Sequence, residues 1–169
     1  MELLTAIESR RSAARLVEPG PTPEDLARII DAAGRAPDHG RLKPWHLLVL
    51  DQATKERFAM AAAQAKRARL PSLSDEQLSA ERERIMRSPT IVIVGCVVRE
   101  HPKVPQIEQV IAAGAAAQNL FLAAHDLGYG VMWRTGAAAY DPDVKTLVGL
   151  RAQDHIVAIM HLGTRPADL

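Results

Sequence analysis

Two arginines and a serine near the start of the sequence could bind a phosphate group. The sequence predicts a short helix over Leu3 to Arg11. Its last turn carries Arg10 and Arg11, and Ser12 follows directly. Two guanidinium groups and a hydroxyl this close together can donate charge-assisted hydrogen bonds to a dianion. Arginines at a helix end also complement the helix dipole and often lie in solvent, so both interpretations stay open.

A second group of polar residues lies in the segment RAPDHGRLKPWH, from Arg35 to His46. This segment contains three cations, one acid and two histidines. Pro37 and Pro44 prevent a regular helix, so we expect a loop that leads into a buried strand over His46 to Leu50. Polar loops of this kind often carry binding residues.

Other common chemistries find little support in the sequence. Cys96 lies in the apolar run TIVIVGCVV, which predicts a buried, inert thiol rather than a nucleophile. His125, His155 and His161 lack metal-ligand spacing with carboxylates, so we expect no metal site. No GxGxxG motif follows a predicted strand, which argues against a Rossmann dinucleotide site.

Helix caps and apolar periodicity define the elements that must position these residues. Thr22 as N-cap and Pro23 at the first helical position begin a helix that ends near Arg35. A capping box of Ser74 and Gln77 begins another, which ends near Arg87. Further helices are predicted over Ala53 to Leu70 and after Asp141, and strands over Thr90 to Val98, Tyr129 to Trp133 and Asp154 to Leu162.

The strands show little alternation between apolar and polar residues, so both faces of the sheet should be covered. By pattern alone, strands that alternate with helices suggest a parallel α/β sheet.

The longest apolar segment, from Pro105 to Trp133, predicts a helix over Gln106 to Leu127. This helix would be roughly 33 Å long at 1.5 Å per residue. A helix that is apolar nearly all round must be covered on nearly all sides. The small residues from Ala112 to Ala117 would let another backbone come close. The helix therefore lies under the sheet of its own domain or packs against a second copy of the chain.

The length of 169 residues and the hydrophobic content of 47% indicate one domain over residues 1–169. The 21 Lys and Arg residues are interleaved with 20 Asp and Glu residues, which gives no electrostatic footprint for nucleic acid. No apolar run is expected to reach the roughly 18 residues that a membrane span needs. The start, MELLTAIESRRS, has neither a hydrophobic signal core nor a cleavage site. We expect a cytoplasmic protein that binds neither nucleic acid nor membrane.

Four segments, in order along the chain, resemble the flavin-dependent nitroreductase family: RRSAARL, RAPDHGRLKPWH, GYGVMWRTGA and HLGTRP. The resemblance covers nearly the whole chain and is closest to the short NAD(P)H nitroreductases. Asp38, His39, Arg41 and Lys43 replace the usual loop residues of the family, as in that short subgroup. The sequence ends soon after Arg165, so we expect the C-terminal arm of many relatives to be absent.

The resemblance implies an α+β sandwich, with a mixed and mainly antiparallel sheet covered by helices, built as an intertwined homodimer around a long central helix. It also implies FMN bound at the dimer interface, with contacts from both chains, and a lid over residues 66–88, although that segment could equally be a plain connector. By this resemblance Arg10, Arg11 and Ser12 hold the FMN phosphate and the neighbouring ring edge, Arg35 and His39 reach the flavin, and Trp133, Arg134 and Thr135 line its other side.

The leading hypothesis is an FMN-dependent oxidoreductase that takes hydride from NAD(P)H and reduces a nitroaromatic, quinone or similar small-molecule acceptor in a ping-pong cycle. No catalytic side chain is expected, because the flavin carries the chemistry. One alternative is another flavin reaction on the same fold, such as enone reduction or fragmentation of the flavin. The other is a flavin-binding or interaction protein without turnover.

Overall fold

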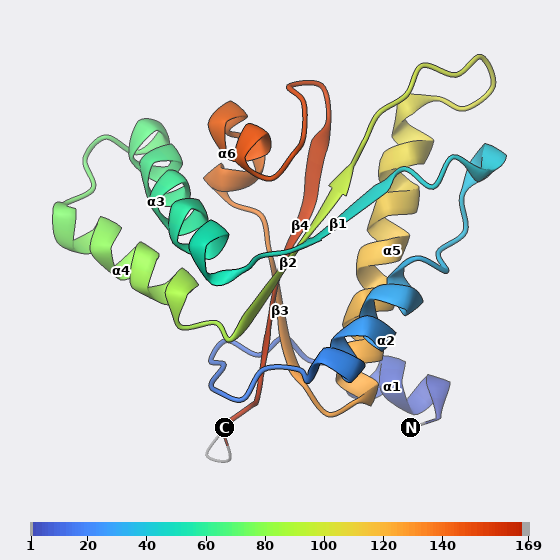
Figure 1. The fold of residues 1–169 in the computed structure, drawn as a ribbon, viewed down its shortest axis with the longest axis horizontal. Helices are drawn as coiled ribbons and strands as arrows, with labels where there is room; N and C mark the ends of the chain where they lie inside the picture. The colour runs from blue at the N-terminus through green and yellow to red at the C-terminus, as the bar shows by residue number, and fades with distance from the viewer. Residues whose placement is uncertain (1, 167–169) are drawn as a thin grey trace.

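A four-stranded antiparallel sheet lies between two helical layers in the computed structural model, which describes residues 2–166 (Figure 1). The strand order is β1-β2-β4-β3, and each of the three pairings is antiparallel. The strands are β1 (Trp45–Val49), β2 (Thr90–Cys96), β3 (Gly130–Arg134) and β4 (His155–Gly163). The predicted α+β class is confirmed, and the parallel sheet suggested by pattern alone is wrong.

The connections explain this topology. A helical hairpin of α3 (Gln52–Arg69) and α4 (Asp75–Met86) joins β1 to β2. Two successive helices bring the chain back to the end of the sheet where β1 finishes, so β2 runs antiparallel to β1. The single helix α5 (Gln106–Asp126) joins β2 to β3, which run in the same direction, but β4 lies between them and is antiparallel to both.

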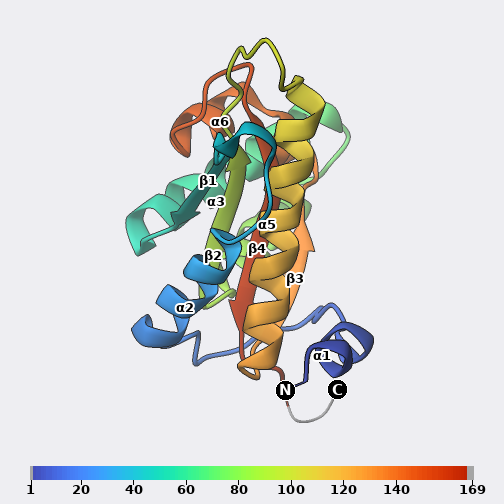
Figure 2. The same cartoon turned by 90° about the vertical axis from the view of Figure 1, so that its right-hand side faces the viewer.

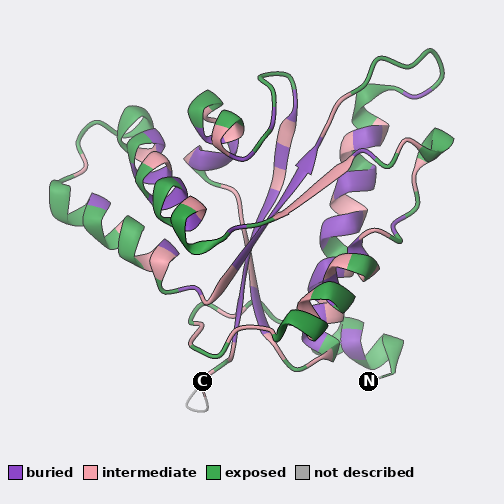
Figure 3. Ribbon diagram, viewed as in Figure 1, coloured by how far each residue is buried: buried purple, intermediate pink, exposed green. Residues whose placement is uncertain are grey.

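The two faces of the sheet are covered by different helices (Figures 1 and 2). α2 (Pro23–Ala33) and α5 cover one face, whereas α3, α4 and α6 (Pro142–Leu147) cover the other. Side chains alternate along β2, with Ile91 and Ile93 in the α3 layer and Val92 and Val94 in the α5 layer. Burial is accordingly highest along the strands and on the inner helix faces (Figure 3). The short elements are α1 (Leu3–Ser9), η1 (His39–Arg41) and η2 (Ala137–Tyr140).

The predicted helix starts are confirmed by their caps. The Thr22 hydroxyl accepts a hydrogen bond from the backbone N–H of Asp25. Ser74 and Gln77 form both halves of the capping box. The Asp141 carboxylate accepts from the first turn of α6. The ends of the elements differ from the prediction by only a few residues.

The small residues of α5 lie mostly inside the chain's own core. Ala112, Ala113, Ala116 and Ala117 are all buried, the last two in the layer between α5 and the sheet. The opposite face of α5 is uncovered: a Cβ added at Gly114 would meet no atom within 4 Å.

By length and composition α5 could cross a membrane, contrary to the prediction that no segment is long enough. It is the one helix of this kind within residues 2–166. Core helices meet the same criterion, and α5 packs against α2 and the sheet. The packing of α5 is that of a core helix.

Candidate functional site

The predicted cofactor residues form three groups in the structure. Arg10 to Ser12 lie near the C-terminal end of α5, His39 lies near its N-terminal end, and Arg35 follows α2 and pairs with Asp31 of that helix. Trp133 to Thr135 lie at the end of β3. Each group has its own surroundings.

Arg10 and Arg165, from the two ends of the chain, both lie near the C-terminal end of α5. Its guanidinium lies 4.9 Å from the ring centroid of Phe121 on α5. Arg165 donates from Nη2 to the backbone oxygen of Arg11 (3.3 Å) and contacts Nδ1 of His125 (3.2 Å). We call Arg10, His125 and Arg165 the Arg10–Arg165 cluster. The bridge between Val17 and Thr164 holds Arg165 beside the N-terminal segment, and the charges of both arginines act on His125.

His125 is held neutral within this cluster. Ser9 donates its hydroxyl to the backbone oxygen of Thr5, so Nε2 of His125 donates to Ser9 Oγ at 2.9 Å. Nδ1 is then free to accept from Arg165. Burial, followed by the charges of Arg165 and Arg10, lowers the pKa of His125. Two positive charges therefore meet beside a neutral imidazole, an arrangement suited to an anion.

Arg11 and Ser12 have few contacts outside their own segment, and their predicted contact with the FMN phosphate stays a prediction. Arg11 Nη1 donates to the backbone oxygens of Glu8 (2.7 Å) and Arg10 (2.8 Å), which favours the helix-end interpretation for this arginine. Ser12 is exposed. Arg165 was not in the predicted set, although the HLGTRP segment contains it.

The loop after α2 lies at the other end of α5. Arg35 forms an exposed ion pair with Asp31 (3.2 Å), and His39 Nδ1 lies 2.6 Å from Glu108 Oε2 in the first turn of α5. Glu108 and Phe121 are about 20 Å apart along the helix axis. Within one chain, the structure does not bring Arg35 or His39 to the Arg10–Arg165 cluster.

Trp133 and Arg134 lie on opposite faces of the sheet, as neighbours in a strand must. Trp133 donates from Nε1 to the backbone oxygen of Val157 (3.2 Å) and packs in the α5 layer, which fits a core aromatic. Arg134 and Thr135 line a cavity on the α3–α4 side. A flavin contact by Trp133 stays a prediction.

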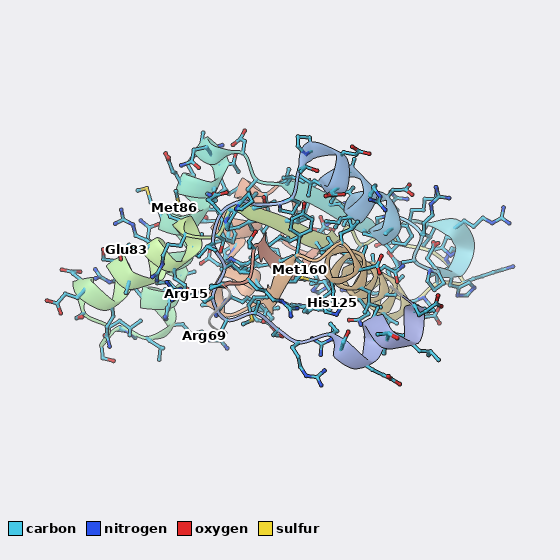
Figure 4. The ribbon with its side chains drawn as sticks, turned by 90° about the horizontal axis from the view of Figure 1, so that it is seen from below. Arg15, Arg69, Glu83, Met86, His125 and Met160 are labelled. Carbon is cyan, nitrogen blue, oxygen red and sulfur yellow. The ribbon has the colours of Figure 1, made fainter. Side chains whose placement is uncertain are left out.

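The cavity beside Arg134 measures about 570 Å³, within the usual range for small-molecule sites. A second cavity of about 460 Å³ shares Arg84, Arg134 and His161 with it. The segment 13–18, which follows Ser12, forms one wall of the second cavity, and its Arg15 lines that cavity together with Arg84 and Arg87 of the α4 end; Arg15 and the α4 residues Glu83 and Met86 are labelled in Figure 4. The wall of the first cavity is partly apolar, with Phe58, Ala62, Ile85, Ala138 and Ile159.

Glu81 on α4 organises the cations of this wall. It accepts from Lys66 Nζ (2.8 Å) and from Arg84 Nη2. Burial alone would raise the pKa of Glu81, but these hydrogen bonds hold it below the ordinary value. Burial and the neighbouring Arg84 charge lower the pKa of Arg134.

His161 lies beneath these arginines with 3 % of its surface exposed. Its Nδ1 is 2.7 Å from Ser88 Oγ, and Lys55 Nζ donates to the backbone oxygen of Ser88 (3.0 Å). Burial and the charges of Arg134 and Arg84 lower the pKa of His161 to about 3, so the imidazole is neutral near pH 7. His161 was not among the predicted site residues, and no motif in the sequence connects it with Arg84.

Cys96 is buried, as predicted, and burial raises the pKa of its thiol to about 11. A thiolate is therefore scarce at neutral pH. Within residues 2–166, no three His, Cys, Asp or Glu side chains are grouped so as to hold a metal ion.

Known proteins match this chain in both sequence and fold. The model of the Nitroreductase family matches residues 7–164. The Escherichia coli K12 protein named "Putative NAD(P)H nitroreductase YdjA" is 39% identical over 164 residues, which cover 97% of this chain and 88% of that protein.

Solved structures of other proteins share the fold, among them the following two. A nitroreductase-like family protein from Bacillus cereus has a TM-score of 0.80 and 24% identity, covering 98% of this chain and 87% of that one. A nitroreductase with bound FMN from Bacteroides fragilis has a TM-score of 0.76 and 24% identity, covering 100% and 91%.

Proposed function

Because the chain belongs to the nitroreductase family, we propose that it is an FMN-dependent oxidoreductase that uses NAD(P)H to reduce a small-molecule acceptor such as a nitroaromatic or a quinone. The family match over residues 7–164 carries the proposal. The name of the E. coli relative supports NAD(P)H as the reductant, and the FMN in the B. fragilis structure supports the cofactor. When bound, FMN supplies the two-electron chemistry.

The residues present suit FMN. The Arg10–Arg165 cluster offers two guanidinium groups to a phosphate, the strongest kind of hydrogen bond available to it. The partly apolar cavity beside Thr135 is large enough for a flat ring system. Arg134 would place positive charge beside a ring that gains electron density on reduction. The segment 13–18 connects the two places, since it follows Ser12 directly and lines the second cavity.

A homodimer would account for the residues that one chain keeps apart. Ile107 and Ile111 on the uncovered face of α5 are each 63% exposed, and Leu3 and Leu4 on α1 are also exposed. Burying such side chains is favourable, so this surface suits a second copy of the chain. In that arrangement His39 and Arg35 of each chain would serve the flavin bound mainly by the other.

In this cycle the protein binds and orients the flavin, NAD(P)H and the acceptor. We propose that residues 1–169 act as one FMN-binding domain, that no side chain serves as a catalytic acid or base, and that NAD(P)H and the acceptor use one open face in turn. The lid over residues 66–88 and the cytoplasmic location stay predictions. Enone reduction, fragmentation of the flavin and binding without turnover are the alternatives, and no observation in the structure favours them.

The absorption spectrum of the purified protein, followed by anaerobic mixing with NADPH in a stopped-flow instrument, tests the proposal. We expect a bound-flavin spectrum that bleaches with NADPH and recovers when a nitroaromatic is added. Protein that purifies without flavin and does not take up added FMN would refute the proposal. Flavin that stays oxidised with both NADH and NADPH would indicate a binding protein instead.

A further inference from the structure

The residues around the two cavities have a much larger excess of basic over acidic side chains than the chain as a whole. The sequence has 21 Lys and Arg against 20 Asp and Glu. The described residues that line the cavities include only two carboxylates, Glu18 and Glu81, against six cations. These cations are Arg15, Lys66, Arg69, Arg84, Arg87 and Arg134. A concave surface with this charge attracts anions.

The nearest carboxylate does not satisfy these cations. Glu81 already accepts from both Lys66 and Arg84. The other terminal nitrogen of Arg84, Nη1, is buried and has no hydrogen-bond partner among the described residues. A buried cationic donor without an acceptor is unfavourable, so an oxyanion that reaches it would bind well.

Neither His161 nor the FMN phosphate serves as the acceptor for Arg84 Nη1. His161 is neutral, and its Nδ1 is engaged with Ser88. The phosphate has its own arginines in the Arg10–Arg165 cluster, which contacts α5 near Phe121 and His125. Arg84 instead projects from α4, on the opposite face of the sheet from α5.

We infer that Arg84, with Arg134 beside it, binds an oxyanion carried by a molecule that reacts with the flavin, either a carboxylate on the acceptor or the 2′-phosphate of NADPH. The guanidinium fork matches both groups geometrically. This inference rests on the proposed function and adds a substrate class to it. Arg84 is then a specificity-determining residue, which selects acidic acceptors or NADPH over their neutral or less charged analogues.

Isothermal titration calorimetry of the FMN-loaded protein with two matched pairs of ligands tests the inference. One pair is 4-nitrobenzoate and 4-nitrobenzyl alcohol, and the other is NADP⁺ and NAD⁺. In Arg84→Gln, the more anionic member of at least one pair should bind roughly tenfold more weakly, while its analogue should change less than about twofold. The pair that responds identifies the source of the oxyanion.

Arg82→Gln is the matched control, because it removes the same charge from the same helix but lies in a different groove, with Asp75 and Leu78. It should leave all four affinities unchanged. Arg84→Met, which removes the charge and keeps an unbranched stem, replaces the glutamine variant if circular dichroism shows that the latter does not fold.

The inference is overturned if neither pair responds to the Arg84 variants, if Arg82→Gln has the same effect, or if the Arg84 variants lose FMN rather than the ligand. Wild-type protein that holds no FMN would refute the proposed function itself, which is a separate outcome.

Discussion

Replacing Arg10 by alanine should weaken FMN binding much more than it weakens the fold. In the folded protein, the contact between Arg10 and Phe121 is a partly exposed cation–π interaction. Such contacts contribute about 0.5–1 kcal/mol at exposed sites. A hydrogen bond to a charged group contributes about 1.5–3 kcal/mol. Loss of that bond to the FMN phosphate corresponds to an increase of roughly 10- to 150-fold in the Kd for FMN.

The assay is a fluorescence titration of apoprotein with FMN, together with thermal unfolding of the apoprotein to measure the fold separately. Arg165→Ala should behave like Arg10→Ala, because both arginines face His125. Arg11→Ala is the matched control, since its guanidinium donates to the backbone oxygens of Glu8 and Arg10. We expect Arg11→Ala to affect FMN binding less than either of the other two variants.

The reasoning would be wrong if Arg10→Ala purified fully yellow with unchanged FMN affinity. In that case Arg10 is a helix-end cation that packs on Phe121, and the phosphate lies elsewhere. Equal losses in all three variants would mean that the contacts of Arg11 change when the flavin binds.

Ile111→Lys places a charge on the uncovered face of α5, so light scattering should detect monomer, and the flavin should be released as the dimer dissociates; a monomer that retains FMN would contradict the dimer proposal. Asp154→Asn should lower the free energy of unfolding by about 2 kcal/mol at pH 7, because hydrogen bonds from Arg151 hold the pKa of Asp154 at about 2; urea titrations should show the difference shrinking as the pH falls through 4 toward 2. In the unfolded chain His161 takes up a proton below about pH 6.5, whereas in the folded chain it does so only near pH 3. The free energy of unfolding should therefore decrease as the pH is lowered from about 6.5 toward 3, by up to about 1.4 kcal/mol per pH unit. His161→Gln should flatten the dependence of Tm on pH. Steady-state kinetics with NADPH and an acceptor should give parallel double-reciprocal lines, and intersecting lines would exclude the ping-pong cycle.

Local chemistry made several elements predictable from the sequence. The cap at Thr22 and the capping box at Ser74 and Gln77 need only partners within three residues, so their hydrogen bonds form wherever the helix forms. The apolar run around Cys96 likewise predicts a buried strand whatever it pairs with. The family resemblance added the α+β class, since the alternation of strands and helices by itself suggested a parallel sheet.

The direction of each strand depends on contacts between distant segments. β2 and β3 are joined by one helix and run in the same direction, as the pattern suggests, but β4 enters between them and pairs with both. Nothing local to β4 specifies that position, because it follows from how the apolar faces of all four strands are shared between two helical layers.

The candidate site separates most clearly what the sequence predicts from what only the tertiary structure decides. Residue type and spacing marked Arg10 as a candidate, and the family resemblance marked Arg134, but Arg165 and Arg84, which share their sites, lie far away in the sequence. Trp133 and Arg134 are neighbours in the sequence, and the strand places them on opposite faces of the sheet. The sequence determined which side chains could bind an anion. The tertiary structure decided which of these side chains lie close together. β4 pairs between β2 and β3, and the residues that follow it bridge to the N-terminal segment, so charges from distant parts of the sequence come to one site.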